Sequence, residues 1–247
     1  MTPWPLLGAA GAVGLALGSY GATAAIRFAR AEGSAAGRSH CDACGASLSF
    51  AQTVPVISYL RLGGACAGCG SRIDPLHLVG EVVGASIVVL SLLVAPLLQA
   101  LTLATLGLLL LTVSIIDVKI QRLPDAFTAA IAVVCGALAL QASTAEALAG
   151  LGAALVSLGV LQAVRLWSRH RRGREGLGLG DVKLVSALAL WLGLATPWMV
   201  VLASILGLGS VAVLRPHMGR LAFGPMICSA AFIIGLIRES GAWPMMP

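Results

Sequence analysis

The chain of 247 residues is 58% hydrophobic and only 11% charged, with a mean hydropathy of +0.96. Charged residues make up about a quarter of an ordinary soluble domain, so this composition excludes one and indicates a polytopic membrane protein. The formal net charge of +6 comes with only 5% aromatic residues. We therefore expect no nucleic-acid partner, because a nucleic-acid-binding surface combines basic residues with stacking aromatic side chains.

Apolar stretches of about 20 residues cross the roughly 30 Å hydrocarbon core of a bilayer as helices. We expect such helices near residues 4–26, 76–98, 99–116, 125–142, 145–166, 182–196, 197–214 and 225–240. Adjoining stretches around Pro96 and Pro197 are separated by a proline rather than by a polar loop. The prediction is an all-α protein with about eight transmembrane helices embedded in the lipid bilayer.

The cationic residues predict the orientation of these helices, because Lys and Arg beside membrane helices are retained in the cytoplasm. Threading eight helices places all but Arg238 of the 16 Lys and Arg residues on one side. The first apolar segment lacks a basic region before it, so we expect it to remain as a helix rather than to be removed as a signal. Its glycines Gly8, Gly11, Gly14 and Gly18 would permit close helix packing, although glycine is common in membrane helices.

Between the first two predicted helices lies a polar insert that carries two Cys-x-x-Cys pairs, Cys41 with Cys44 and Cys66 with Cys69. Thiolates at this spacing suit Zn²⁺ in a tetrahedral Cys₄ site, with tight turns helped by glycines after each pair. A cytoplasmic insert argues against disulfides. We expect a structural zinc, because so short an insert builds little hydrophobic core, and a redox pair is the alternative. The other two cysteines lie in apolar helices and are expected to be small core residues.

Asp117 and Asp181 stand at the ends of apolar segments that otherwise carry almost no charge. In the predicted topology both reach the same membrane boundary, and an intramembrane acid is by default a functional-site hypothesis. Two adjacent ionised carboxylates repel, so one holds a proton while the other stays anionic. An anionic aspartate activates water and a protonated one polarises a carbonyl, which is the chemistry of aspartic peptidases. The alternative is a pair of interfacial acids neutralised by Lys119, Arg122 and Lys183.

Four residues near these acids are candidate supporting residues. Gly178 and Gly180 would allow the Gly-Leu-Gly-Asp turn to approach an extended substrate strand without a Cβ clash. Asp125 is either a third site acid or an acid placed at a helix N-terminus by the helix dipole. Lys183 either adjusts the acidity of Asp181 or extends its side chain along the apolar surface to the membrane boundary.

Motifs in order along nearly the whole chain resemble those of the type IV prepilin peptidases, membrane-embedded GxGD aspartic proteases that also act as N-methyltransferases. The matching segments are residues 38–44, residues 55–60, the second cysteine pair with Ile73 and Glu81, residues 116–117 with 123–125, residues 178–184 and residues 223–225.

The resemblance implies removal of the basic leader of prepilins or pseudopilins at the cytoplasmic face of the bacterial inner membrane, with Asp117 and Asp181 as the catalytic pair. It also implies methylation of the new N-terminus with S-adenosylmethionine by the region that bears the cysteines. We expect residues 1–98 to form that region and residues 99–247 to form a six-helix peptidase domain. Glu81 would lie near the start of the second helix, where it would contact cofactor or substrate amine, with pairing to Arg72 as the alternative.

Other functions remain open on the sequence alone. One is a peptidase that lacks methyltransferase activity. Another is a zinc-stapled scaffold without catalysis. A proton-coupled transporter is a third, although no internal repeat is apparent and the acids lie at one boundary rather than at the middle of the membrane.

Overall fold

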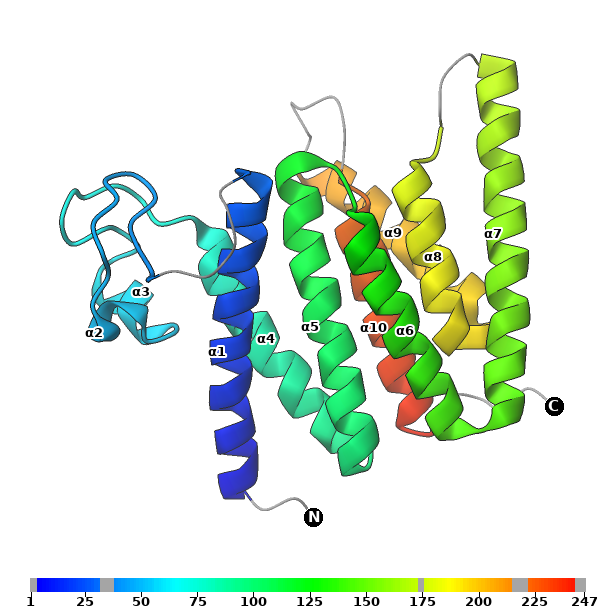
Figure 1. Cartoon of the computed structure of the whole chain (residues 1–247), viewed down its shortest axis with the longest axis horizontal. Helices are drawn as coiled ribbons and strands as arrows, with labels where there is room; N and C mark the ends of the chain where they lie inside the picture. Colours follow the sequence, from blue (N-terminus) through cyan, green and yellow to red (C-terminus); the bar gives the residue numbers. More distant parts are fainter. Residues whose placement is uncertain (1–3, 32–37, 173–175, 215–221, 243–247) are drawn as a thin grey trace.

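The computed structural model describes residues 4–31, 38–172, 176–214 and 222–242 (Figure 1). These residues form helices only, apart from isolated antiparallel bridges between His40 and Ser47 and between Ala65 and Arg72. The predicted all-α fold is confirmed. In chain order the helices are α1 (Trp4–Ala29), α2 (Phe50–Thr53), α3 (Ile57–Arg61), α4 (Pro75–Val94), α5 (Leu97–Ile120), α6 (Asp125–Ala142), α7 (Thr144–Arg172), α8 (Leu179–Leu192), the 3₁₀ helix η1 (Gly193–Ala195), α9 (Thr196–Leu214) and α10 (Gly224–Glu239).

Among the described residues, 6 helical segments are long and apolar enough to cross a membrane. Five of them belong to α1, α4, α5, α6 and α7, and the sixth is the 35-residue stretch Leu179–Val213, which contains both α8 and α9. Helix α10 has only 16 residues. Each apolar stretch predicted from the sequence is thus helical, whereas the count of about eight separate crossings stays a prediction.

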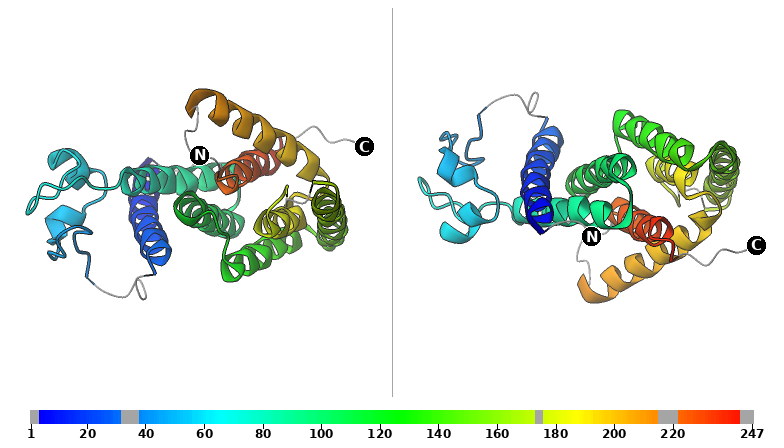
Figure 2. Two further views of the ribbon diagram at one scale, coloured as in Figure 1. Left: turned by 90° about the horizontal axis from the view of Figure 1, so that it is seen from above. Right: turned by 90° about the horizontal axis from the view of Figure 1, so that it is seen from below.

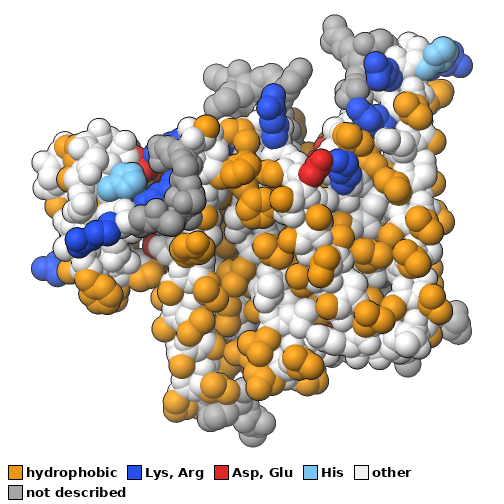
Figure 3. Space-filling model, viewed as in Figure 1, with side chains coloured by type: hydrophobic (Ala, Val, Ile, Leu, Met, Phe, Trp, Pro, Cys, Tyr) orange, Lys and Arg blue, Asp and Glu red, His pale blue; other side chains and the backbone are white. Residues whose placement is uncertain are grey.

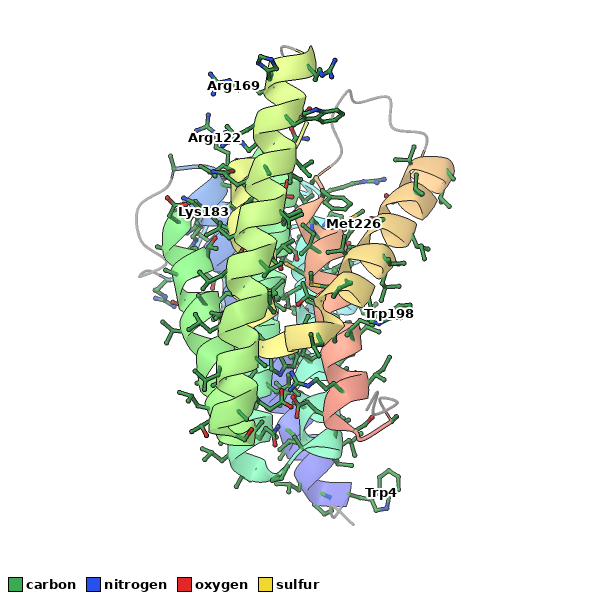
Figure 4. The ribbon with its side chains drawn as sticks, turned by 90° about the vertical axis from the view of Figure 1, so that its right-hand side faces the viewer. Trp4, Arg122, Arg169, Lys183, Trp198 and Met226 are labelled. Atoms are coloured by element: carbon green, nitrogen blue, oxygen red, sulfur yellow. The ribbon has the colours of Figure 1, made fainter. Side chains whose placement is uncertain are left out.

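A sharp break separates α8 from α9. Gly193 ends α8 with a positive φ of 53°, a conformation that glycine adopts without a Cβ clash. The hydroxyl of Thr196 then donates to the carbonyl of Gly193 at 2.7 Å, and Pro197 follows in the first turn of α9, where no backbone N–H is needed. From this corner, marked by Trp198 in Figure 4, α9 rises away from α7.

Helix α5 is the centre of the bundle, because it packs against α1, α4, α6 and α10. Figure 2 shows α1 and α4 on one side of α5 and the remaining long helices on the other. The largest hydrophobic cluster lies on that second side and includes the buried indole of Trp191. On the face shown in Figure 3, Lys and Arg side chains gather at one end of the helices and on the insert between α1 and α4.

Helices α1 and α4 pack closely through glycines. A Cβ added to Gly18 would lie 2.2 Å from the carbonyl oxygen of Gly80, and one added to Gly14 would lie 2.7 Å from that of Gly84. Two of the glycines predicted for helix packing therefore have that role. Gly8 does not, since a Cβ there would meet no atom within 4 Å.

A polar network surrounds the C-terminal end of α10, which is the end opposite Gly224. The carboxylate of Glu239 accepts hydrogen bonds from Trp191 Nε1 at 2.9 Å and from Gln99 Nε2. The neighbouring Arg238 pairs with Glu146 at 2.6 Å. These bonds connect α10 to the start of α5, the start of α7 and the end of α8, so they fix the position of α10 in the bundle.

Candidate active site

Asp117 lies in α5, one turn before the helix ends at Ile120, and its side chain is only 6% exposed. The backbone N–H of Gly224, the first residue of α10, donates to Asp117 Oδ2 at 2.9 Å. The first N–H groups of any helix lack intrahelical partners, and the positive end of the helix dipole attracts a carboxylate. The start of α10 therefore holds one oxygen of Asp117 in place.

Asp181 lies in the first turn of α8, because Gly178 is the N-cap and the helix begins at Leu179. The segment expected to be a Gly-Leu-Gly-Asp turn is therefore mostly helical. A Cβ on Gly180 would lie 3.0 Å from the side chain of Leu123, so Gly180 allows α8 to pack against the loop before α6. At Gly178 the atom nearest to an added Cβ is Asp181 Oδ2, at 3.0 Å.

The fold brings the two aspartates close enough for the charge of Asp117 to act on Asp181. Asp181 lines an apolar cavity of about 70 Å³, and Phe223 lines it too. The next residue, Gly224, holds Asp117, so two consecutive residues at the start of α10 reach both acids. Figure 4 shows this end of α10, marked by Met226, between the diverging helices α7 and α9.

Cys228 lies one turn further along α10. Its thiol is buried and interacts with the side chain of Ser114. It lies close enough to Asp117 and Asp181 for the charges of both to act on it. The sequence predicted Cys228 only as a core residue, and its proximity to the acids has no signal in the sequence beyond its spacing from residues 223–225.

The nearby lysines pair with other acids. Lys119 is bonded to Asp74, and Lys183 is bonded to Asp125 at 2.7 Å. Asp125 is the first residue of α6 and its side chain is 77% exposed, so the structure places it at a helix N-terminus and away from the buried pair. The alternative in which Lys119 and Lys183 neutralise the two candidate acids is not supported by these contacts.

Glu81 is a buried carboxylate in α4, with only 7% of its surface exposed. Ser19 Oγ donates to Glu81 Oε1 at 2.8 Å, and the backbone N–H of Val56 donates to Glu81 Oε2 at 2.7 Å. Among the described residues these partners replace Arg72, the alternative partner considered from the sequence. Glu81 thereby ties the insert to α1 and α4.

The four cysteines of the insert come together as the sequence predicts. Their sulfur atoms lie within 4.8 Å of one another, and none forms a disulfide. Backbone N–H groups of Cys44 and Ala43 lower the pKa of Cys41 to about 6, which favours its thiolate, the form that binds metals. The backbone N–H of Ala46 acts to lower the pKa of Cys44, but the interactions of its thiol with Cys69 and Cys41 outweigh this and raise the pKa to about 11. Each cysteine pair is closed by a glycine of positive φ, Gly45 at 70° and Gly70 at 71°. The described cluster has the ligands and the spacing of a metal site.

A second and much larger cavity, of about 720 Å³, lies between this insert and the ends of α1 and α4. Its walls include Arg27, Tyr59, Glu81 and Lys119. Asp117 and Asp181 do not line it, so the buried acids and this cavity are distinct places in the molecule.

Comparison with known protein families gives a separate match for each half of the chain. The description "Bacterial Peptidase A24 N-terminal domain" matches residues 12–95, and "Type IV leader peptidase family" matches residues 103–213. A protein from Neisseria gonorrhoeae named "Prepilin leader peptidase/N-methyltransferase" is 33% identical over 81% of this chain and 71% of its own length. The chain belongs to the type IV leader peptidase family.

Other curated relatives in this family have similar names. A Burkholderia pseudomallei protein with the same name is 33% identical over 78% of this chain and 64% of its own length. The "Type 4 prepilin-like proteins leader peptide-processing enzyme" of Escherichia coli is 31% identical over 77% of this chain and 72% of its own length. No solved structure matches the chain significantly.

The leader peptidase match contains Asp117 and Asp181 but ends before α10. Gly224 and Cys228, which the structure places beside the acids, therefore lie outside the matched residues. In the sequence, only the motif at residues 223–225 indicated that the start of α10 contributes to the site, in addition to α5 and α8.

Proposed function

We propose that this protein is a membrane-embedded aspartic endopeptidase that removes the leader peptide of type IV prepilins or pseudopilins. The convergence of Asp117 and Asp181 from α5 and α8, beside the start of α10, carries the proposal. Membership of the type IV leader peptidase family supports it, as do the names of the relatives.

In the proposed reaction the ionised aspartate accepts a proton from a water molecule while the water oxygen bonds to the scissile carbonyl carbon. The protonated aspartate donates its proton to the carbonyl oxygen. Collapse of the tetrahedral intermediate breaks the C–N bond, and the leaving nitrogen takes a proton to become the new amine. The bond from Gly224 fixes Asp117 Oδ2 for this work and leaves Oδ1 to face the water.

Four further residues are proposed to support the pair. Gly180 and Gly178 allow the first turn of α8 to lie close to the loop before α6 and leave the backbone near Asp181 accessible to a substrate strand. The ion pair between Lys183 and Asp125 links α8 to the start of α6 and so steadies the position of Asp181. We assign Asp125 this supporting role instead of a chemical one.

The proposed site lies at the cytoplasmic face of the bacterial inner membrane, in a protein with about eight membrane helices. The concentration of cationic side chains at the aspartate end of the helices supports this orientation. Residues 1–98 are proposed as the methyltransferase-associated region and residues 99–247 as the peptidase domain, a division supported by the two separate family matches.

We further propose that a structural Zn²⁺ is held by Cys41, Cys44, Cys66 and Cys69. Four thiols that lie within 4.8 Å of one another are a suitable donor set for tetrahedral zinc. Bound zinc would cross-link the two cysteine pairs of an insert that has few buried apolar side chains of its own.

The second proposed activity is N-methylation of the new N-terminus with S-adenosylmethionine. The names of the relatives support it, and Glu81 is the proposed cofactor-binding residue. A peptidase without this activity is the alternative. Incubating the purified protein with cleaved substrate and labelled S-adenosylmethionine separates the two, because only the bifunctional enzyme transfers label.

Replacing each acid tests the peptidase proposal. Asp117→Asn and Asp181→Asn should each lower prepilin cleavage in proteoliposomes by about three orders of magnitude or more, as losses of catalytic groups do. Asp42→Asn, on an exposed aspartate of the insert that pairs with Arg30, is a matched charge-removing control that should cleave normally. Normal processing by either aspartate variant would refute the assigned pair.

A further inference from the structure

The small apolar cavity beside Asp181 has no role in the reaction as described so far. It has a volume of about 70 Å³, and its wall combines side chains of α7, α8 and α9 with the start of α10. Asp181 is the one ionisable residue among the described residues of this wall. Protein interiors seldom contain voids larger than a water molecule, so an open space beside a reacting group calls for an explanation other than packing.

Residues one helical turn apart build most of the wall. They are Asp181 with Val185 on α8, Met199 with Ala203 on α9, and Phe223 with Ile227 at the start of α10. Positions i and i+4 lie on the same face of a helix, so each of these helices presents two adjoining side chains to the cavity. Leu161 adds a side chain from α7. Met199 and Ala203 are almost completely buried, so they face the cavity and not the lipid.

Helix α9 also positions the ring of Phe223 in this wall. A Cβ added to Gly207 of α9 would lie 2.9 Å from that ring, so the glycine allows the ring to lie directly against the helix. The next residue, Gly224, donates its N–H to Asp117. A peptide that lies across both acids would therefore pass beside the wall formed by Phe223.

The cavity lies between helices that diverge. Figure 4 shows α7 and α9 spreading apart toward the end of the bundle that carries the acids. Helix α7 packs against α6, α8 and η1, whereas α9 packs mainly against α10. In the described part of the chain α7 and α9 thus have no extensive contact with each other, and a group that entered between Leu161 and Met199 would not have to separate two tightly packed helices.

We propose that this cavity receives an apolar side chain of the substrate, from a residue that flanks the scissile bond. The inference rests on the proposed peptidase function. Consecutive Cα atoms are about 3.8 Å apart, so a scissile carbonyl at the acids places the adjoining side chain close to Asp181, which itself lines the cavity. The apolar wall favours a hydrocarbon group and disfavours a charged one, because burial of an unpaired charge is costly.

The volume of the cavity indicates the size of that side chain. A cavity of roughly 150 Å³ holds a benzene ring, so one of about 70 Å³ suits an aliphatic group better than an aromatic ring. Ala203 leaves this space open, since a larger side chain there would fill it. Met199 limits the space in a less rigid way, because its unbranched side chain adapts to neighbouring groups. These two residues of α9 are therefore the proposed determinants of size.

Cleavage of a set of matched prepilins by the full-length protein in proteoliposomes tests this subsite. The set carries Ala, Leu, Phe or Lys in turn at each of the two positions that flank the cleaved bond. At one of these positions the unmodified protein should prefer Leu to Lys. Ala203→Leu should lower kcat/KM for the Leu substrate about tenfold relative to the Ala substrate, as small size changes in apolar pockets do. Ala212→Leu, at an exposed position of α9, is the matched control and should keep the unmodified preference.

Met199→Ala tests the same cavity in the opposite direction, and it decides the question if Ala203→Leu does not fold. The larger cavity should raise kcat/KM for the Phe substrate relative to the Leu substrate by a similar factor. Variants that slow every substrate equally, or that keep the unmodified order of preference, would overturn the subsite and mean that packing or a lipid chain fills the cavity. Absence of cleavage by the unmodified protein would instead overturn the peptidase proposal, and this subsite with it.

Discussion

The backbone N–H of Gly224 donates a 2.9 Å hydrogen bond to the carboxylate of Asp117, although the two residues are 107 positions apart in the chain. A side chain at position 224 would collide with that carboxylate, because its Cβ would lie 2.7 Å from Oδ2 and 3.0 Å from Cγ. The first residue of α10 is thus a positioning residue for one of the two acids. Its own position is set at the other end of the helix by the bonds of Glu239.

Gly224→Ala should therefore impair cleavage more than stability. We expect kcat for prepilin cleavage to fall on the order of 100-fold, since displacing a catalytic group by about 1 Å has that effect, with KM little changed. Gly136→Ala in α6 is the matched control, because a Cβ there meets no atom within 4 Å. A Gly224→Ala enzyme with normal kcat would show that the bond to Asp117 has no catalytic consequence.

The contact between α1 and α4 depends on Gly18 in a different way. Gly18→Ala would place a Cβ 2.2 Å from the backbone carbonyl of Gly80, which cannot rotate away as a side chain could. The helices must separate, and we expect a loss of about 1–3 kcal/mol in the free energy of unfolding, typical of overpacking. Denaturant titration in detergent measures this loss of stability. The control is Gly8→Ala, whose Cβ meets no atom within 4 Å. Equal stability of the two variants would contradict the close contact.

Much of the fold and of the site follows from local features of the sequence. Apolar length and prolines located the long helices, and the two Cys-x-x-Cys pairs located the cluster, because each pair forms its turn independently of the rest of the chain. Asp117 and Asp181 were recognisable since a charge in an apolar segment stands out. These predictions needed no knowledge of which helices touch.

Tertiary contacts explain what the sequence did not predict. The approach of Gly224 to Asp117 depends on the packing of α10 against α5, and the bond from Val56 to Glu81 depends on how the insert folds back over α4. The alternative in which Lys119 and Lys183 neutralise the candidate acids also depends on tertiary contacts, which do not support it. Lys119 and Lys183 lie two residues after the candidate acids, yet helical geometry points residues two apart to different sides, and each lysine reaches an acid of another helix.

The cysteine cluster gives a prediction that does not depend on catalysis. Elemental analysis of the purified protein should find about one zinc per chain, and Cys66→Ser should lower that content and make residues 38–74 more sensitive to protease. Cys135→Ser is the control, since Cys135 is fully buried in α6 and outside the cluster. Protein that is intact, folded and free of zinc would contradict the metal site.

The ion pair of Asp74 with Lys119 predicts a dependence of stability on pH. Partial burial alone would raise the pKa of Asp74, but hydrogen bonds from Lys119 and from the backbone N–H of Leu76, together with the lysine charge, hold it below its ordinary value of 3.8. Because the folded pKa is the lower one, the stabilisation is fully present above about pH 4 and is lost as the pH falls through the folded pKa.

Thermal unfolding is measured in nonionic detergent from pH 7 down to the lowest pH at which the protein stays folded. Asp74→Asn should be less stable than the unmodified protein at neutral pH, and the difference in stability should shrink as the pH falls. Lys119→Met should show the same convergence, because it removes the other partner of the pair. A deficit of Asp74→Asn that stays constant down to the lowest pH would mean that the aspartate acts only as the N-cap of α4, through its bond from Leu76, and not through its charge.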